Sequence, residues 1–341
     1  MARLATILRA LTTALARDQK SIWSLAGNNF FITAVLLSTV GKMYEAASFF
    51  GLMIGLVVLF PLSTDPLRKI PPSRLSLWPL SARDRGVLRA ASPWVNPMTW
   101  VLAALAVWAL RGKVSLSLLA LAAGLIAFGF VLSSVPMPDP GRWRHLPNFP
   151  TTLNQLIRKN IRGMLSTLDV YCALLLSLLT LGYRVTGHGP QPEALMVMTV
   201  LTVISLSSIA QCLFGLDGRG GLSRYGLLPL GGWQILAAKD AAFLLVTVVV
   251  TLPLAPLAGL GAGMVALAVG HKNSVEAPRA QVRWRFSTGG SFWPQGVIQI
   301  GAIALATSSI LLNSWLFLFP CIVACGFSTW WYGRSAPGRN T

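Results

Sequence analysis

Charged residues and glycines gather in one stretch of the sequence, residues 214–240. Asp217 and Arg219 lie in a glycine-rich turn, and Lys239 and Asp240 end the stretch after a Leu-Leu-Pro-Leu segment. Long apolar runs adjoin the stretch on both sides. Charged turns between apolar runs are typical of loops at a membrane surface. We therefore predict that residues 214–240 form a structured loop on the charged side of a membrane protein.

The sequence carries few residues that could perform catalysis. Its three histidines, His145, His188 and His271, are far apart, and neither a His-Glu-x-x-His zinc motif nor an ATP-binding phosphate loop occurs. Cys321 and Cys325 are one helical turn apart, but no histidine or carboxylate accompanies them, so we predict no metal site. We predict no enzymatic activity and no cofactor, and any energy from ATP must come through a partner chain.

Asp169 is the one acidic residue of ten that lies well inside an apolar run. A carboxylate inside a membrane is costly and usually marks a functional site. Asp169 also lies near the predicted beginning of its helix, where the helix dipole and headgroup water favour a carboxylate. Both interpretations stay open. Proton-driven transporters usually bury several carboxylates or histidines, so this single candidate does not favour a secondary transporter.

The composition places the chain in a lipid bilayer. Of its 341 residues, 54% are hydrophobic and 11% are charged, and the mean hydropathy is +0.63. A membrane-spanning helix needs about 20 mostly apolar residues, and long apolar runs without alternation favour helices over barrel strands. We predict an all-α polytopic membrane protein with about ten transmembrane helices. The predicted spans are residues 29–40 with their flanks, 46–62, 97–110, 114–135, 165–183, 194–214, a pair within 241–270, 297–312 and 314–332.

The apolar segment 241–270 is short for the crossings that it must provide. Pro253 and Pro256 interrupt it, and two helices in this length would each be only about 22 Å long. Basic loops flank the segment on both sides, so an even number of crossings is required. We predict a proline-broken hairpin, either spanning or re-entrant. The alternative is one long kinked span, which would place the following basic loop outside the cell.

The net charge of +18 is compatible with nucleic-acid binding until its distribution is considered. Of the 28 Lys and Arg residues, 24 lie in six segments, and the apolar runs lie between these segments. This asymmetry is the positive-inside pattern. It predicts a protein of the cell (inner) membrane with both termini in the cytosol, membrane lipids as partners and no nucleic-acid partner. The six segments are residues 1–27, 63–96, 136–165, 216–240, 271–296 and 334–341.

Two amphipathic helices are predicted to lie in the membrane interface. Leucines recur on one face of residues 1–20, and leucine and isoleucine recur on one face of residues 151–165. Basic residues occupy other parts of each helix surface. A helix of this kind lies along the headgroups and does not cross the bilayer.

The chain is predicted to consist of two membrane halves joined by a proline-rich connector. Residues 1–150 contain about four spans, and residues 151–341 contain about six. Each half has one large basic cytosolic loop, which we call an elbow. The first elbow is residues 63–96, with a short amphipathic helix around Leu88, and the second is residues 216–240.

Four segments of the basic loops have a distinctive pattern of charged, glycine, proline and aromatic residues: DPLRKIPPSRLSLWPLS at 65–81, FGLDGRGG at 214–221, LLPLGGWQILAAKD at 227–240 and RWRFSTGGSFWPQG at 283–296. In these segments the chain resembles the integral membrane permeases of ABC-2 type exporters. Together with the hydropathy, the resemblance covers most of the chain. It implies a permease subunit that forms the translocation path, assembles as a homodimer or heterodimer of permeases and is driven by a separate ABC ATPase subunit. Members of that family usually have a longer apolar stretch after the LLPL segment.

The two elbows are the predicted sites of coupling to an ATPase. This chain has no nucleotide site, so hydrolysis in a partner must act through its cytosolic loops. Two other functions stay open, a non-catalytic membrane scaffold or assembly factor and a membrane-embedded lipid or polyprenyl transferase. The candidate coupling residues are Arg68, Trp78 and Pro79 in the first elbow and Asp217, Arg219, Arg224, Pro229, Trp233 and Lys239 in the second.

Overall fold

The computed structural model divides the chain into two compact units, Met1–Pro138 and Asp139–Thr341. The predicted division at residue 150 lies shortly after this boundary. The four spans predicted before residue 136 lie outside the described residues. The structure describes residues 6–7, 9–10, 12–13, 67, 78, 80–95, 152–185, 192–217, 224–276, 278, 287 and 293–336.

The first unit contains the short amphipathic helix that the sequence predicts around Leu88. Helix α6 (Ala82–Ala91) begins after Ser81, whose hydroxyl accepts a hydrogen bond from Asp84 N at 3.1 Å and so caps the helix. A short 3₁₀ turn, η2 (Ser92–Val95), follows it. Leu88 is 1% exposed and forms a small core with Leu67 and Leu80, against which Ile7 and Trp78 pack.

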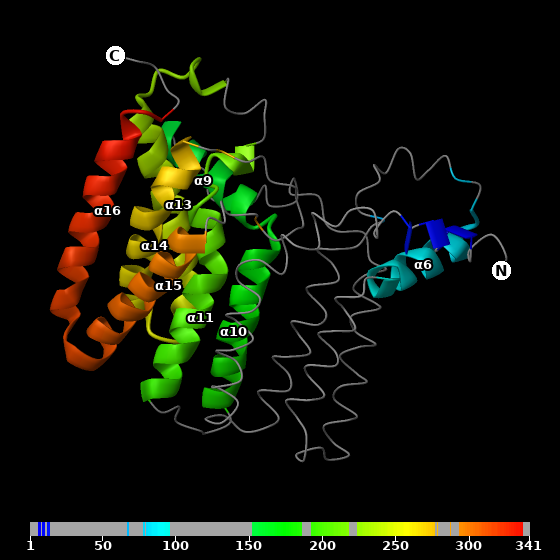
Figure 1. Ribbon diagram of the computed structural model, residues 1–341, viewed down its shortest axis with the longest axis horizontal. Helices are drawn as coiled ribbons and strands as arrows, with labels where there is room; N and C mark the ends of the chain where they lie inside the picture. Colours follow the sequence, from blue (N-terminus) through cyan, green and yellow to red (C-terminus); the bar gives the residue numbers. More distant parts are fainter. Residues whose placement is uncertain are drawn as a thin grey trace. The chain divides into compact units, whose positions relative to one another are not determined.

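The second unit is a helical bundle (Figure 1). No strand occurs among its described residues. The predicted helical fold is confirmed for this part of the chain. The helices are α9 (Thr152–Met164), α10 (Leu168–Val185), α11 (Pro192–Ala210), α13 (Gly232–Thr251), α14 (Pro256–Glu276), α15 (Trp293–Ser308) and α16 (Leu318–Gly333), with short turns η4 (Gly215–Asp217), η5 (Ser309–Asn313) and η6 (Trp315–Phe317).

Four helical stretches in the described residues are long and apolar enough to cross a membrane. A fifth is obtained if α9 and α10, which meet at a bend of 79°, are counted as one broken span. These helices are compatible with membrane insertion, but the predicted count of ten spans is not confirmed. The four stretches are Pro192–Ala210, Gly232–Thr251, Gln295–Asn313 and Trp315–Gly333.

The predicted bounds of the segment 241–270 are wrong, because both of its helices extend into the flanking loops. Helix α13 already begins at Gly232 and α14 ends only at Glu276, so they contain 20 and 21 residues. Each is therefore about 30 Å long, and the expected shortage of length does not exist. Part of the second elbow is helix. Pro253 lies in the turn between the two helices, and Pro256 is the first residue of α14.

Glycines let α13 and α14 pack closely as an antiparallel pair. A Cβ atom on Gly263 would lie 3.1 Å from the Thr247 side chain, and one on Gly259 would overlap the Thr251 side chain. Gly259, early in α14, meets Thr251 at the end of α13, whereas the later Gly263 meets the earlier Thr247. The two helices therefore run in opposite directions, as the predicted hairpin requires. The alternative of one kinked span is excluded. The glycine-rich GLGAG segment is thus a packing surface between helices.

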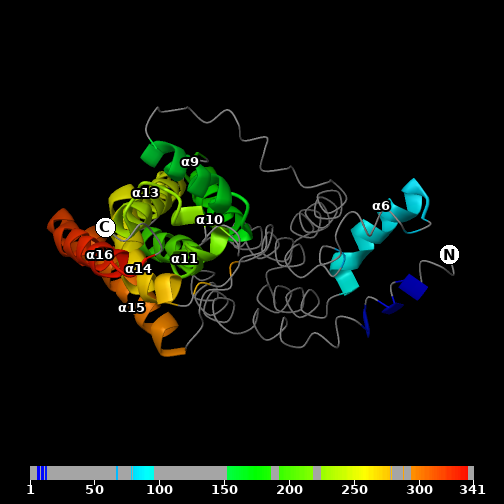
Figure 2. The ribbon, with the colours of Figure 1, turned by 90° about the horizontal axis from the view of Figure 1, so that it is seen from above.

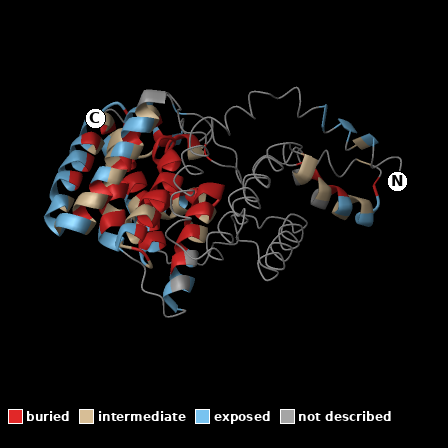
Figure 3. Cartoon of the chain, turned by 60° about the horizontal axis from the view of Figure 1, so that its bottom comes forward, coloured by how far each residue is buried: buried red, intermediate tan, exposed pale blue. Residues whose placement is uncertain are grey.

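Helix α14 lies at the centre of the bundle (Figure 2), where it packs against α11, α13, α15 and α16. The outer helices are far less covered. Within the membrane-length windows, 78% of the α11 residues are buried, against 22% in the stretch that contains α16 (Figure 3). The uncovered side of α16 carries large apolar residues, including Phe319, Phe327 and Trp331. An apolar outer face of this kind is what a helix in contact with lipid presents.

Candidate functional site

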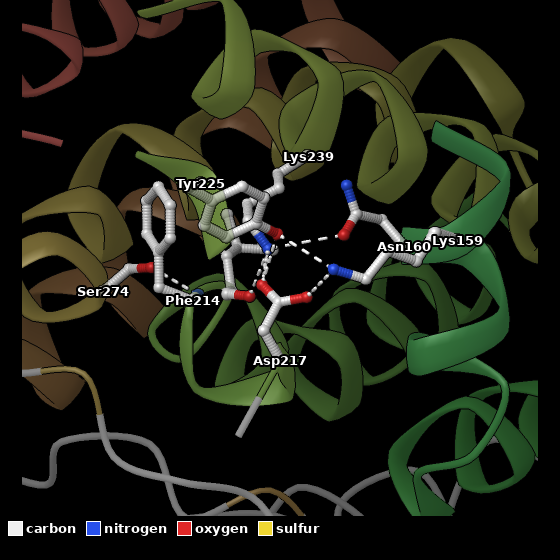
Figure 4. A network of polar contacts seen from close by, with 8 residues as sticks. Lys159, Asn160, Phe214, Asp217, Tyr225, Lys239 and Ser274 are labelled. Carbon is white, nitrogen blue, oxygen red and sulfur yellow. Dashed lines mark hydrogen bonds and ion pairs between the residues drawn. The ribbon is translucent and has the colours of Figure 1, made fainter. Parts of the chain in front are cut away.

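Lys239 is a buried cation on α13, and its ammonium group lies where three parts of the chain meet (Figure 4). The side chain is 1% exposed. Its Nζ atom donates to Asp217 Oδ2 at 2.5 Å, to Leu213 O at 2.9 Å and to Asn160 Oδ1 at 3.3 Å. A lysine ammonium has three N–H donors. Every proton of this buried charge therefore has an acceptor, one each from η4, the turn after α11, and α9.

Two aromatic rings enclose the same ammonium group. The Nζ atom lies 4.9 Å from the centre of the Phe214 ring and 5.5 Å from that of Tyr225. The two rings meet edge to face at 6.1 Å. Aromatic faces attract cations by their quadrupole, so the rings exclude water without leaving the charge unstabilised. The backbone N–H of Phe214 also donates to Ser274 Oγ at 3.3 Å, which fixes the turn to α14.

Asp217 is the anion at the centre of this cluster, and its side chain is 3% exposed. Its Oδ1 atom lies 2.7 Å from Lys159 Nζ of α9. Its Oδ2 atom accepts from Lys239 and, at 2.6 Å, from the hydroxyl of Tyr225. Lys159 is 53% exposed, so the surplus positive charge of this two-cation, one-anion cluster faces solvent. We call Asp217, Lys239, Lys159, Asn160 and Tyr225 the Asp217 network.

The surroundings fix the charge states of Asp217 and Tyr225. Burial by itself raises the pKa of the Asp217 carboxyl, but the charge of Lys239 and hydrogen bonds from Lys159, Lys239 and Tyr225 outweigh it, so the pKa is lowered. Burial, followed by the negative charge of Asp217, raises the pKa of the Tyr225 hydroxyl. Asp217 is therefore ionised and Tyr225 is protonated at neutral pH, as their hydrogen bond requires.

The lowered pKa of Asp217 predicts how its contribution to stability depends on pH. A carboxyl with a lower pKa in the folded chain adds stability above its unfolded pKa of about 3.9, and this is lost as the pH falls through the folded pKa. We expect the difference in unfolding free energy between wild type and Asp217→Asn to be constant from about pH 5 to 8 and to shrink below about pH 4. Denaturant titrations in detergent measure this difference. The exposed Glu193, replaced by Gln, is the control, and a difference that grows on acidification would contradict the assigned charge.

A second buried polar cluster joins α13, α14 and α16. His271 Nε2 lies 2.9 Å from Asp240 Oδ1, and His271 Nδ1 lies 2.8 Å from Ser328 Oγ. Thr329 Oγ1 donates to the other carboxylate oxygen of Asp240 at 2.7 Å. His271 is 0% exposed. We call these four residues, Asp240, His271, Ser328 and Thr329, the His271 cluster.

The His271 cluster contains the order of groups found in serine hydrolases, but it lacks the geometry for that reaction. Ser328 lies inside α16, where its hydroxyl also has the backbone oxygen of Ala268 at 3.0 Å. A nucleophilic serine needs backbone N–H donors aimed at the oxyanion that it creates. The N–H groups around Ser328 point along the interior of a helix, where they bond to the preceding turn. The arrangement therefore joins three helices, and it does not form an oxyanion site.

Asp169 lies in the first turn of α10, as the sequence predicts, and it is 3% exposed. Its Oδ1 atom accepts from Ser208 Oγ of α11 at 2.7 Å. Its Oδ2 atom accepts from Ser287 N at 2.8 Å and from Ser287 Oγ at 2.9 Å. Asp169 thus joins Ser287 to the beginning of α10. A further functional role for this carboxylate stays a prediction.

The predicted coupling residues fall into two groups in the structure. Asp217 and Lys239 contact each other in the interior, although Lys239 was predicted in a loop and is in fact part of α13. Arg224 and Pro229 are exposed on the segment that leads into α13, and Trp233 is exposed in the first turn of α13. In the first unit, Trp78 is half-buried against a small core. Arg68, Pro79 and Arg219 lie outside the described residues.

Comparison with known proteins gives no match, either to a family model, to a curated protein or to a solved structure. The assignment of a function to this chain therefore depends on its own sequence and geometry.

Several residues of these clusters are not among the predicted site residues. Asn160 lies between Leu156 and Met164 on the buried side of α9. The sequence predicts a different apolar face, the one with recurring leucine and isoleucine, and Leu153 on that face is 38% exposed. His271 and Asp240 lie at the two ends of the apolar segment 241–270. A hairpin centred on its prolines brings these ends together, so the predicted hairpin contained a usable signal for the pair. Asp240 and Asp169 are both buried, so the bundle buries more carboxylates than Asp169 alone, the one that the sequence places well inside an apolar run.

Proposed function

We propose that this chain is the membrane-spanning permease subunit of an ABC-2 type exporter, which forms the translocation path and is driven by a separate ATPase subunit. The observation that carries the proposal is the buried ammonium group of Lys239, which joins α9, the turn after α11, and α13. A subunit without a nucleotide site must receive motion through a stiff part of its surface. Packed helices and hydrogen-bond networks are the elements that transmit such motion.

The Asp217 network supplies this stiffness. Moving α9 relative to α13 would separate Asp217 from Lys159 or Lys239, which it contacts at 2.7 and 2.5 Å. Leaving a buried charge without its partner costs about 3 to 5 kcal/mol. The three elements therefore move together, and a force applied to any of them reaches the membrane-length helix α13. In this proposal α9 lies along the cytosolic headgroups and the network marks the cytosolic end of the bundle.

An exposed surface beside the network is the proposed contact with the ATPase. Leu227 is 84% exposed and Trp233 is 57% exposed. In the sequence, the exposed Arg224 precedes Leu227, and the exposed Pro229 lies between Leu227 and Trp233. Trp and Arg are the residues most often found at the energetic centre of protein interfaces. We call these four residues the elbow patch. Lipid headgroups are the other ligand that Arg and Trp can bind at this depth, and the experiment below distinguishes the two.

The test replaces Arg224 and Trp233 together with alanine. The tagged full chain is isolated from its native membranes, and the amount of co-purified ATPase and its rate of ATP hydrolysis are measured. We expect both to fall about tenfold or more, because charge pairs and aromatic anchors at an interface contribute about 2 to 5 kcal/mol.

Trp315→Ala is the matched control, because this tryptophan is also exposed, at 68%. It lies just before the first residue of α16, at the end of that helix opposite to its last residue, Gly333. It should leave co-purification unchanged. If the elbow-patch variant inserts normally and both measurements stay at the wild-type level, the coupling assignment is wrong. If the wild-type chain isolates without any ATPase, a scaffold function replaces the permease.

A further inference from the structure

Asp240 and Lys239 are adjacent on α13 but serve different clusters. Lys239 faces α9 and the Asp217 network, whereas Asp240 faces His271 of α14 and Thr329 of α16. The proposed function uses only the first of these clusters. A histidine that is 0% exposed and in contact with a carboxylate still requires an explanation.

We propose that the His271 cluster is a proton-binding site at the junction of α13, α14 and α16. This inference goes beyond the proposed function and does not depend on which partner drives the chain. The cluster can satisfy the hydrogen bonds of His271 in both its neutral and its protonated form.

Neutral His271 is fully hydrogen-bonded in this geometry. Its Nε2–H donates to Asp240 Oδ1 at 2.9 Å, and its Nδ1 accepts from the Ser328 hydroxyl at 2.8 Å. Asp240 Oδ2 is occupied independently by Thr329. Neutral imidazole has one donor and one acceptor nitrogen, and both are used. In this state the Asp240 carboxylate accepts one hydrogen bond on each oxygen, from His271 and from Thr329.

Protonated His271 is also fully hydrogen-bonded, and no backbone movement is needed. The new Nδ1–H donates to Ser328 Oγ, and the Ser328 hydroxyl turns to donate to Ala268 O, which lies 3.0 Å away. The imidazolium then contacts the Asp240 carboxylate, so the buried positive charge has a partner. Buried charges persist only when they are paired and hydrogen-bonded. Proton uptake therefore requires the rotation of one hydroxyl group.

Other titratable groups around His271 do not occupy its two nitrogen atoms. Lys239 on α13 is held by Asp217, and Tyr332 on α16 presents its ring at 6.5 Å from the imidazole. Helix α15 carries no titratable side chain, and α11 has only Glu193 in its first turn. The remaining titratable groups on the helices packed here, or just after them, are Lys272 and Glu276, both exposed on α14, the thiols of Cys321 and Cys325 on α16, and Arg334, which lies over the Trp330 ring.

The test follows the ring nitrogens of His271 directly. The full chain is labelled with ¹⁵N-histidine in detergent micelles, with His145→Gln and His188→Gln leaving one histidine signal. Spectra between pH 5 and 9 distinguish the neutral tautomer from the imidazolium. We expect one reversible step from a neutral form with its proton on Nε2 to the doubly protonated ring. If that double variant does not fold, the wild-type spectrum minus that of His271→Gln gives the same signal.

Two variants test the partners that the mechanism names. Asp240→Asn removes the counter-charge and should move the titration midpoint to lower pH by about one pH unit or more. Ser328→Ala removes a hydrogen bond that is stronger to the charged ring than to the neutral ring, and should lower the midpoint by about half a unit or more. Ser308→Ala on α15, whose hydroxyl donates to Leu305 O, is the matched control and should leave the midpoint unchanged.

The proposal is overturned if the His271 signals stay in one form from pH 5 to 9, which would make the cluster a structural contact only. It is equally overturned if the signals titrate but Ser328→Ala leaves the midpoint in place. If Asp240→Asn does not fold, the Ser328→Ala result alone decides. Neither result depends on an ATPase, so failure of the proposed function leaves this test intact.

Discussion

Replacing Asp217 with asparagine is expected to lower the free energy of unfolding by about 3 to 5 kcal/mol. The variant leaves Lys239 in the interior, 1% exposed, without its carboxylate. Asn160 and Leu213 still accept two of its protons, but neither carries a charge. A buried charge that loses its partner cannot be rehydrated without opening the packing between α9 and α13. Denaturant titration of the purified chain in mixed micelles measures the loss.

Lys239→Met is the informative companion variant. It should cost less than Asp217→Asn, because Asp217 keeps Lys159 at 2.7 Å and the Tyr225 hydroxyl at 2.6 Å. The double variant should be more stable than the sum of the two losses predicts, because no unpaired buried charge remains. We expect a coupling of at least about 1 kcal/mol between the two positions.

Glu193→Gln again serves as the control, since Glu193 is exposed in the first turn of α11. It should change the unfolding free energy by less than about 0.5 kcal/mol. Additive losses at Asp217 and Lys239 would mean that the two side chains do not stabilise each other. The elbow would then lack the rigidity that the proposed function requires.

The bundle helices that carry few charges could be predicted from the sequence. Residues 165–183, 194–214 and 314–332 correspond to α10, α11 and the stretch that contains α16, with ends displaced by a few residues. Their apolar runs are bounded by prolines and polar or charged residues, and a helix in lipid must satisfy its own backbone. The hydropathy alone therefore locates them.

The ends of α13 and α14 could not be predicted in the same way. Hydropathy treats Lys239, Asp240 and His271 as loop residues, because an unpaired charge is costly inside a membrane protein. Each is paired in the structure by a residue that is distant in sequence. The free-energy cost of burying these polar groups predicts that the helices end before them. In the structure this cost is offset by partner residues that lie outside the short stretch of sequence over which hydropathy is averaged.

Gly270 on α14 is predicted to tolerate substitution poorly, because its nearest neighbours are backbone atoms of α11. A Cβ atom at this position would lie 2.8 Å from both the carbonyl carbon and the oxygen of Ala210 on α11. Backbone atoms cannot move aside as a flexible side chain does. Gly270→Ala should therefore separate α11 from α14 and lower the unfolding free energy by about 1 to 3 kcal/mol, and Gly270→Leu should prevent folding.

Gly301 and Gly326 provide matched controls, for which replacement by alanine is expected not to lower stability. Both are in helices, and a Cβ atom on either would meet no atom within 4 Å. Alanine is a better helix former than glycine by up to about 1 kcal/mol, so Gly301→Ala and Gly326→Ala should be neutral or stabilising. Detergent-solubilised yield and the midpoint of thermal unfolding distinguish the three alanine variants. Equal behaviour at Gly270 and Gly326 would contradict the close approach of α11 and α14.

The effect of Gly270→Ala should also reach the neighbouring His271. The close approach of Gly270 to Ala210 fixes how deeply α14 sits in the bundle, and His271 meets Asp240 and Ser328 only at that depth. A shift of α14 by a few tenths of an ångström lengthens both hydrogen bonds, and hydrogen bonds weaken steeply with distance and angle. The proton titration of His271 should therefore be altered in Gly270→Ala and preserved in Gly326→Ala, because only the first variant moves the helix that carries the imidazole.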